Sequence, residues 1–428
     1  MTIRIRTDRH LVRASHRSVR YVLAELTAPP KPEPADPAGG RERPPVNLAF
    51  VVDRSGSMSG DKIRLAKKAV EEALARLGPD DRFAVVVYDD QIDVVVPTTK
   101  ATADARRDAV DRLSRIDARG STDLGGGWLR GCEQVALALE ADGVNRCLLL
   151  TDGLANVGIT DRDALTTHAV ELRARGVSTS TFGVGDDFDE ALLQSMASAG
   201  GGHFYFIADA ATIRDHITSE VGEALDIVAR AVSVEIAAPA GVTVESLSPY
   251  PTRVRSSGTE ILVGDLVSDE QVRVVLRFAF PYGKPGERMG VALSVVDREG
   301  VLGQDGDRLH WEYADDRAND EQGRDREVDR AVATLFAARA RQEAVRLNRQ
   351  GDFEAARRAL RAVARRIAGY AGHDAELRSI RDDLEREAEE MAAPMPELAL
   401  KQVFASASYA SFSRAPSGRA LRSSDPKR

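Results

Sequence analysis

Five apolar segments alternate with amphipathic ones between residues 46 and 226, and this alternation constrains the fold more than any other feature. Between the first two apolar segments, residues 61–77 place apolar side chains three and four positions apart, the helical period. Strands that alternate with helices form a mostly parallel sheet with helices on both faces. We therefore expect a doubly wound, mostly parallel α/β domain over residues 46–226. The expected strands are 47–53, 82–88, 145–151, 177–184 and 203–207.

The segments that flank this α/β domain have different patterns. Residues 2–6 and 19–26 look like strands, and residues 227–315 hold short alternating segments punctuated by Gly and Pro. This second pattern is typical of an antiparallel β-sandwich. Residues 316–395 are rich in Ala and Arg and predict helices, with a turn at Gly351-Asp352.

Two segments predict little regular structure. Residues 28–45 are rich in Pro and predict an extended linker. Residues 396–428 are rich in Ser and poor in aliphatic side chains at their end, so we expect a flexible tail. Its aromatic side chains could form a docking motif or pack back onto the helices, and the sequence does not decide between these. They are Phe404, Tyr409 and Phe412.

Composition excludes several function classes. The chain has 428 residues, 43% apolar and 29% charged, as in soluble globular proteins of several domains. A net charge of -8 gives no reason to expect nucleic acid or anionic lipid as a partner. No window of eighteen apolar residues predicts a membrane span, and the first residues lack the apolar core of a signal peptide, so we expect the cytoplasm. The histidines show no ligand spacing, which favours surface or packing roles.

A basic N-terminal stretch leaves two interpretations open. It fits a solvated sheet face balanced by acids elsewhere better than a polyanion site. The residues concerned are Arg4, Arg6, Arg9, Arg13, Arg17 and Arg20.

Polar side chains stand where three segments of the expected sheet end. Asp53 closes the first strand, with Ser55 and Ser57 on the following turn; Thr122 precedes a helix, and Asp152 follows a third strand. Ligands of parallel α/β sheets bind at the carboxyl ends of the strands. Two carboxylates and three hydroxyls suit a hard cation such as Mg²⁺, which prefers six oxygen ligands and retains waters. The sequence therefore predicts a magnesium site, with one position open to a partner's carboxylate.

A simpler interpretation is that Ser55 or Ser57 only caps the helix over residues 61–77. Capping explains one serine, but it does not explain Asp53, Thr122 and Asp152.

The motifs DRSGS, GSTDLGG and TDG resemble the metal-ion-dependent adhesion site of von Willebrand factor type A domains. Residues 181–207 also resemble the closing strand–helix–strand of that family. The resemblance implies a protein-interaction module that performs no chemistry. A partner's Asp or Glu would complete the coordination of Mg²⁺, with Mn²⁺ or Ca²⁺ as alternatives. The implied metal ligands are Asp53, Ser55, Ser57, Thr122 and Asp152.

In that family the two carboxylates bind the metal directly or through water, and Thr122 would contact it mainly when a partner is engaged. Bacterial cytoplasmic members often carry a β-sandwich whose first strands come from the N-terminus, which implies that residues 1–27 complete the sandwich of residues 227–315. Some members act with AAA+ ATPases, so the resemblance suggests such a system as a partner.

Two other functions compete with this interpretation. A scaffold that works through its sandwich and helices would bind partners regardless of metal. A haloacid-dehalogenase-like phosphotransferase would use Asp53 as nucleophile, with Thr151 and Asp186-Asp187 in the order of that family. That chemistry needs a second carboxylate two residues after the nucleophile as general acid–base, and Ser55 stands there.

Overall fold

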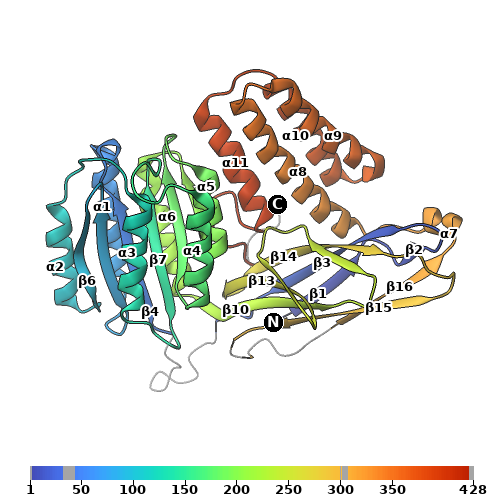
Figure 1. Cartoon of the computed structure of the whole chain (residues 1–428), viewed down its shortest axis with the longest axis horizontal. Helices are drawn as coiled ribbons and strands as arrows, with labels where there is room; N and C mark the ends of the chain where they lie inside the picture. Colours follow the sequence, from blue (N-terminus) through green and yellow to red (C-terminus); the bar gives the residue numbers. More distant parts are fainter. Residues whose placement is uncertain (1, 32–43, 299, 301–306, 424–428) are drawn as a thin grey trace. The chain divides into compact units, whose positions relative to one another are not determined.

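The computed structural model describes residues 2–31, 44–298, 300 and 307–423, which fall into two compact units (Figure 1). One unit is Pro32–Ile227, and the other combines Met1–Lys31 with Val228–Arg428. The expected linker over residues 28–45 lies mostly outside the described residues.

The unit Pro32–Ile227 is built on one six-stranded sheet with the order β6-β5-β4-β7-β8-β9. All neighbouring pairs are parallel except β5 and β6, which form an antiparallel edge. The expected fold class, a mostly parallel doubly wound sheet, is confirmed. The strands are β4 (Val46–Asp53), β5 (Arg82–Tyr88), β6 (Ile92–Lys100), β7 (Val144–Thr151), β8 (Ser178–Val184) and β9 (Gly201–Ile207).

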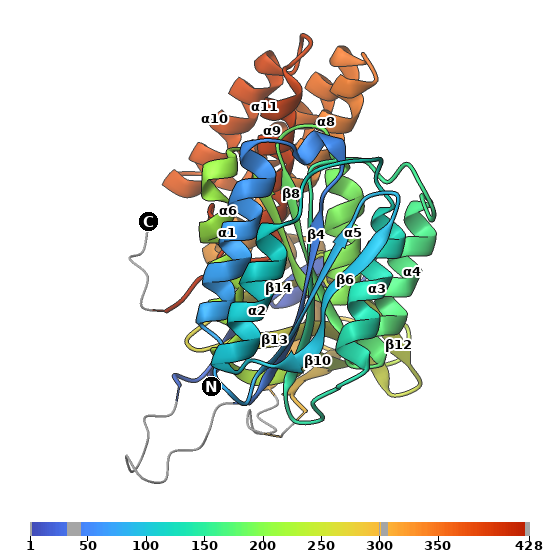
Figure 2. The same ribbon diagram turned by 90° about the vertical axis from the view of Figure 1, so that its left-hand side faces the viewer.

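Helices cover both faces of this sheet, with α1, α2 and α6 on one side and α3, α4 and α5 on the other (Figure 2). This explains why β4 and β7 are buried at every residue and are mostly apolar. The helices are α1 (Asp61–Ala75), α2 (Ala103–Ser114), α3 (Leu124–Ala136), α4 (Arg162–Ala174), α5 (Glu190–Gly200) and α6 (Ile213–Ala224), with short 3₁₀ turns η1 (Gly56–Met58) and η2 (Ala210–Thr212).

The second unit contains two sheets that enclose an apolar core. Their orders are β1-β3-β14-β11 and β12-β13-β10-β15-β16-β2. The pairs β1–β3, β3–β14, β14–β11, β12–β13, β10–β15 and β15–β16 are antiparallel, and β16 and β2 form a short parallel pair. The strands are β1 (Thr2–Thr7), β2 (Leu11–Arg13), β3 (Ser18–Thr27), β10 (Ile227–Ala237), β11 (Thr243–Ser246), β12 (Thr252–Arg255), β13 (Gly258–Val267), β14 (Gln271–Phe280), β15 (Arg288–Val296) and β16 (Asp307–Ala314).

Strand β3 is central to this unit because both of its faces are buried. Val22, Ala24 and Leu26 point into the core between the sheets. Leu23 points the other way and packs with apolar residues of helix α8, among them Val328. The alternation of the strand therefore joins the sandwich on one side to the helices on the other.

The C-terminal helices form a further apolar cluster of their own. Their side chains interdigitate along the long helix α8, which also carries the contact with β3. The helices are α7 (Asp316–Glu321), α8 (Arg326–Arg349), α9 (Phe353–Ala371), α10 (Ala375–Glu390) and α11 (Glu397–Ser411).

The expectation of a flexible tail over residues 396–428 is wrong for its first part, which forms α11. Leu400 and Phe404 are buried, and the small Ala and Ser side chains around them allow close packing and lose little rotamer freedom. Phe412 packs edge-on against Tyr250, with ring centroids 5.4 Å apart. The aromatic side chains thus pack onto their own unit, while residues 424–428 lie outside the described part.

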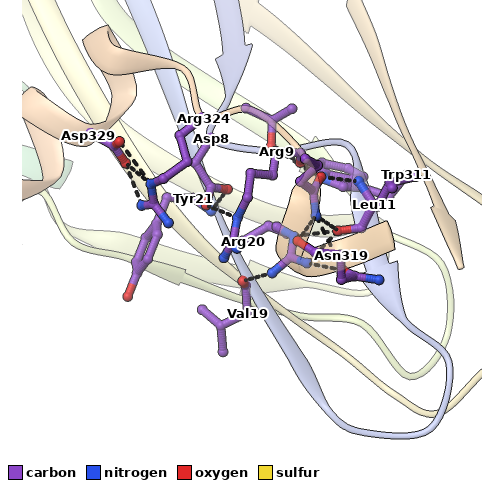
Figure 3. Close-up of polar contacts among 12 residues, drawn as sticks. Asp8, Arg9, Leu11, Val19, Arg20, Tyr21, Trp311, Asn319, Arg324 and Asp329 are labelled. Atoms are coloured by element: carbon purple, nitrogen blue, oxygen red, sulfur yellow. Dashed lines mark hydrogen bonds and ion pairs between the residues drawn. The ribbon is translucent and has the colours of Figure 1, made fainter. Parts of the chain in front are cut away.

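A buried polar network links the N-terminal strands to β16 and α7 (Figure 3). Arg20 donates to the carbonyl of Leu11 at 2.7 Å and to Asn319 at 2.7 Å, and burial lowers its pKa to about 10. Asp8 accepts the amide of Tyr21 at 2.8 Å, and burial raises its pKa. Trp311 donates to the carbonyl of Arg9 at 3.0 Å.

Three of the basic N-terminal residues are paired with acids, as expected for a charge-balanced face, but Arg20 is buried and contradicts a solvated position for that residue. Arg6 lies 3.2 Å from Asp325, and Arg13 lies 2.7 Å from Asp316. Arg9 pairs with Asp8 at 3.3 Å.

Across the described ranges, no helix is both long and apolar enough to cross a membrane.

The packing of α11 can be tested with Leu400→Ala. Leu400 is 2% exposed in the helical cluster, so its truncation should lower the free energy of unfolding by about 2–5 kcal/mol. Leu398→Ala, on the same helix but exposed, should change it by less than about 0.5 kcal/mol. Urea unfolding of the full chain measures both, and equal values would contradict the packing of α11.

Candidate metal centre

Two acidic residues lie at the ends of adjacent parallel strands. Asp53 is the last residue of β4, and Asp152 directly follows β7, which pairs with β4. Both are 0% exposed. Burying an ionised carboxylate is costly unless a cation or hydrogen bonds compensate it, so this edge of the sheet favours a positive charge.

Asp53 is held in a fixed orientation by neutral groups. Its Oδ1 accepts the amide of Ser55 at 2.7 Å, and its Oδ2 accepts the hydroxyl of Thr151 at 2.7 Å. Tyr88 donates more weakly, at 3.5 Å. Burial raises the pKa of Asp53 to about 6, although the hydrogen bonds from Thr151 and Ser55 oppose the shift.

Ser55, Ser57 and Asp152 place their oxygens at the spacing of metal ligands. Ser55 Oγ lies 3.1 Å from Ser57 Oγ, and Ser57 donates to Asp152 Oδ1 at 2.7 Å. Two neighbouring ligands of an octahedral cation with bonds of about 2.1 Å are about 3 Å apart. The donor set therefore fits a small, hard cation.

Thr122 lies in the loop before α3, beside the same oxygens. A Cβ on Gly153 would lie 3.5 Å from Thr122 Oγ1 and 3.8 Å from Ser57 Oγ, so the two hydroxyls flank this glycine. Asn156 fixes the backbone of Thr122. The backbone amide of Thr122 donates to Asn156 Oδ1 at 3.1 Å, and the backbone amide of Asn156 donates to the carbonyl of Thr122 at 3.3 Å. The structure thus brings all five sequence-predicted residues to one edge of the sheet.

Backbone hydrogen bonds fasten the first two loops to each other. The amide of Gly56 donates to the carbonyl of Gly120 at 3.1 Å, and the amide of Arg119 donates to the carbonyl of Arg54 at 2.7 Å. The loop that carries the serines and the loop that carries Thr122 therefore have a fixed relative position.

A buried ion-pair network, which the sequence did not reveal, supports these loops. The buried carboxylate of Asp89 accepts Arg54 Nε at 3.2 Å and Arg119 Nε at 2.7 Å. Burial would raise the pKa of Asp89, but the hydrogen bonds from Arg119, the Gln91 amide and Arg54 outweigh it and hold the pKa below its usual value. Asp93 also pairs with Arg54, at 2.5 Å.

Glycines let helix α3 approach the metal loops closely. A Cβ at Gly127 would come within 2.4 Å of the ring of Tyr88, and a Cβ at Gly131 within 2.1 Å of Val51. Larger side chains would displace Tyr88, whose hydroxyl faces Asp53.

The interpretation of the serines as helix caps is wrong. Helix α1 has Gly60 at its N-cap and no side-chain capping hydrogen bond. Ser55 precedes η1 without a side-chain cap bond, and its hydroxyl faces Ser57 instead. Both hydroxyls are thus available as ligands.

A lysine also reaches the site. Lys62, in the first turn of α1, places Nζ 2.5 Å from Asp152 Oδ2. Sequence reasoning overlooked it, although its position in the first turn after the DRSGS loop was a usable signal.

A second polar cluster lies away from these loops. His203, Glu220 and Glu223 have their potential ligand atoms within 4.8 Å of one another, a grouping that the spacing of the histidines did not predict. Glu220 already accepts Arg146 at 2.7 Å and Tyr205 at 2.6 Å. This cluster therefore acts as an internal ion-pair network that ties α6 to the sheet.

The raised pKa of Asp53 predicts a measurable pH effect in the metal-free protein. The pKa of Asp53 in the folded protein, about 6, lies above the 3.8 of a free aspartate, so folding favours the protonated acid. The free energy of unfolding therefore falls as pH rises from about 4 to above 6. Asp53→Asn removes this cost, so the variant should exceed the parent protein by up to about 3 kcal/mol at pH 7 and by little at pH 4.

The measurement is denaturant unfolding in chelator across this pH range. Asp80→Asn, which removes an exposed acid of the same unit, is the control. If the difference in the free energy of unfolding between Asp53→Asn and the parent protein did not change with pH, the raised pKa of the buried Asp53 would be contradicted.

The network around Asp89 can be tested separately. Asp89→Ala removes the buried partner of Arg54 and leaves it the half-exposed Asp93, so the free energy of unfolding should fall by about 1.5–3 kcal/mol. Asp93→Ala removes an acid that is 53% exposed and should cost no more than about 1 kcal/mol. Similar losses in thermal or urea unfolding would mean that the buried network does not support the loops.

Comparison with known proteins identifies this unit. Residues 47–219 match the von Willebrand factor type A domain. The uncharacterized protein YfbK of Escherichia coli (strain K12) is 33% identical over 197 residues, covering 46% of this chain and 34% of YfbK. Inter-alpha-trypsin inhibitor heavy chain H1 of Mesocricetus auratus is 29% identical over 266 residues, 59% of this chain and 28% of that protein.

This chain therefore spans about a third of the length of these two relatives. A solved von Willebrand factor type A structure from Catenulispora acidiphila superposes with a TM-score of 0.67 at 19% identity, covering 94% of this chain and 88% of that one, and shows the same fold. Domains of this type are often metal-dependent protein-interaction modules. Residues 47–219 of this chain are a von Willebrand factor type A domain.

Proposed function

We propose that this chain is a non-enzymatic protein-interaction module that binds a partner's acidic side chain through Mg²⁺. The cation would be held by Ser55, Ser57 and Thr122 directly and by Asp53 and Asp152 directly or through water. The observation that carries the proposal is the convergence of these side chains, with both carboxylates fully buried and Ser57 exposed.

The donor set favours an acidic partner. With Asp53 and Asp152 bound through water, the direct protein ligands are the three neutral hydroxyls, which leave the cation strongly electrophilic. An incoming Asp or Glu side chain would supply a charged ligand at the open position. The cation would act as a Lewis acid that attracts the partner's carboxylate oxygen and fixes its position.

The loop after Asp152 provides an apolar rim for such a partner. Leu154 is 55% exposed and Val157 is also exposed, both within the segment that follows Gly153. Exposed aliphatic side chains beside a charged site are typical of interaction surfaces. A partner whose acidic residue has apolar neighbours would fit this combination.

The arrangement of Asp53 argues against phosphotransfer. Both of its oxygens accept hydrogen bonds, and the residue two positions later is Ser55, which cannot serve as a general acid–base near neutral pH. The proposal also includes a bacterial cytoplasmic location and an AAA+ ATPase as one class of partner, both carried over from the family resemblance.

The metal site is tested by titrating Mg²⁺ into the chelated full chain by calorimetry. Asp53→Ala should abolish binding because it removes a buried ligand, while circular dichroism shows the fold retained. Full Mg²⁺ affinity in this variant would refute the assigned ligands.

The partner role is tested by capture from native lysate in Mg²⁺ and in EDTA, with partners identified by mass spectrometry. A protein captured only with Mg²⁺ should no longer be captured by Asp53→Ala. Thr122→Ala should weaken capture of this protein more than it weakens Mg²⁺ binding. Identical captured sets in both conditions would favour a metal-independent scaffold that acts through the sandwich and helices.

A further inference from the structure

Lys62 occupies a position at the metal centre that the proposed coordination does not use. Its side chain extends from the first turn of α1, and Nζ lies 2.5 Å from Asp152 Oδ2. Asp152 is 0% exposed, whereas Lys62 is 28% exposed. A charged group that is open to solvent on one side thus touches a fully buried metal ligand on the other.

Both oxygens of Asp152 are engaged in this arrangement. Oδ1 accepts the hydroxyl of Ser57 at 2.7 Å, and Oδ2 accepts Lys62. Asp152 is one of the five expected ligands, so the ammonium group contacts a carboxylate that the cation would also use. A divalent cation that uses Asp152 must share or take over this carboxylate.

The two carboxylates of the site are compensated differently. Asp53 accepts hydrogen bonds from the Ser55 amide and the Thr151 hydroxyl, both neutral groups. Asp152 accepts an ammonium group, which supplies a full positive charge to a buried anion. Lys62 is therefore the group of α1 that stabilises the ionised site before any metal binds.

A lysine is suited to a reversible contact of this kind. Its charge is compact and sits on a flexible four-carbon stem, so it can leave a carboxylate without moving the backbone. Nζ also lies near Gly185, where a Cβ would be 3.6 Å away, so the loop after β8 leaves space beside the ammonium group. Arginine, with its planar fork, would hold the carboxylate more rigidly.

We propose that Lys62 is an internal counter-cation that competes with the divalent cation for Asp152 and thereby sets the cation affinity of the site. This inference rests on the proposed metal-binding function. The resting site holds its buried charge with Lys62, and loading requires the ammonium group to withdraw toward solvent. The contact between Lys62 and Asp152 thus lowers the affinity of the site for the cation.

The test compares Lys62→Met with Lys68→Met in the full chain after chelation. Both changes remove one positive charge from α1, but Lys68 is 52% exposed and pairs with Glu71 on the helix surface. Calorimetric titration with Mg²⁺ and with Mn²⁺ gives the affinities. Lys62→Met should tighten binding about tenfold, and Lys68→Met should stay within about twofold of the parent protein.

A second readout does not depend on the loaded site. Without metal, Lys62→Met should melt at a lower temperature than Lys68→Met, because Asp152 loses its counter-ion, and saturating Mg²⁺ should remove this difference. If Lys62→Met does not fold without metal, Lys62→Gln serves instead, since it keeps a donor without the charge. Lys62→Gln should also tighten binding, whereas Lys62→Arg should not.

The outcomes separate the two proposals. Equal or weaker Mg²⁺ binding by Lys62→Met, while the parent protein binds and Asp53→Ala does not, overturns the competition and leaves the metal site intact. If Lys62→Met binds Mg²⁺ and the parent protein does not, Lys62 competes strongly enough to prevent detectable binding, which supports the proposal. Absence of binding in the parent protein and in both neutral variants refutes the proposed metal function, and this inference with it.

Discussion

The von Willebrand factor type A domain depends on one electrostatic constraint. Two carboxylates are fully buried where adjacent strands of its parallel sheet end. An ionised acid in such a place requires a compensating cation or several hydrogen bonds. Asp53 accepts hydrogen bonds from neutral groups and its pKa is raised, whereas Asp152 forms an ion pair with Lys62. The proposed divalent cation would compensate both acids at once.

The surrounding structure keeps these acids in place without contributing ligands. The Asp89 network and the backbone bonds between the first two loops fix the positions of the serines and Thr122. Close packing of α3 on Tyr88 and Val51 prevents the sheet edge from relaxing.

Much of the fold follows from local patterns. The segments that became β4, β5, β7, β8 and β9 were recognisable because buried parallel strands are rich in apolar and β-branched residues. The antiparallel edge strand β6 was missed, since its half-exposed residues show no continuous apolar run. The helix α11 was missed because Ala and Ser side chains resemble a disordered composition until a partner helix covers them.

The sequence by itself determined the fold class of the von Willebrand factor type A domain, and it predicted that Asp53, Ser55, Ser57 and Asp152 share one edge, because they follow the ends of parallel strands. The expectation that Thr122 also follows a strand is wrong, since its loop joins α2 to α3, and only the family resemblance pointed to it. Only the tertiary structure decided which atoms meet there. The contacts of Lys62 with Asp152 and of Asp89 with two arginines join residues from different elements. The position of Lys62 just after the DRSGS loop was a usable signal, but the contacts themselves depend on how helices and loops pack in three dimensions.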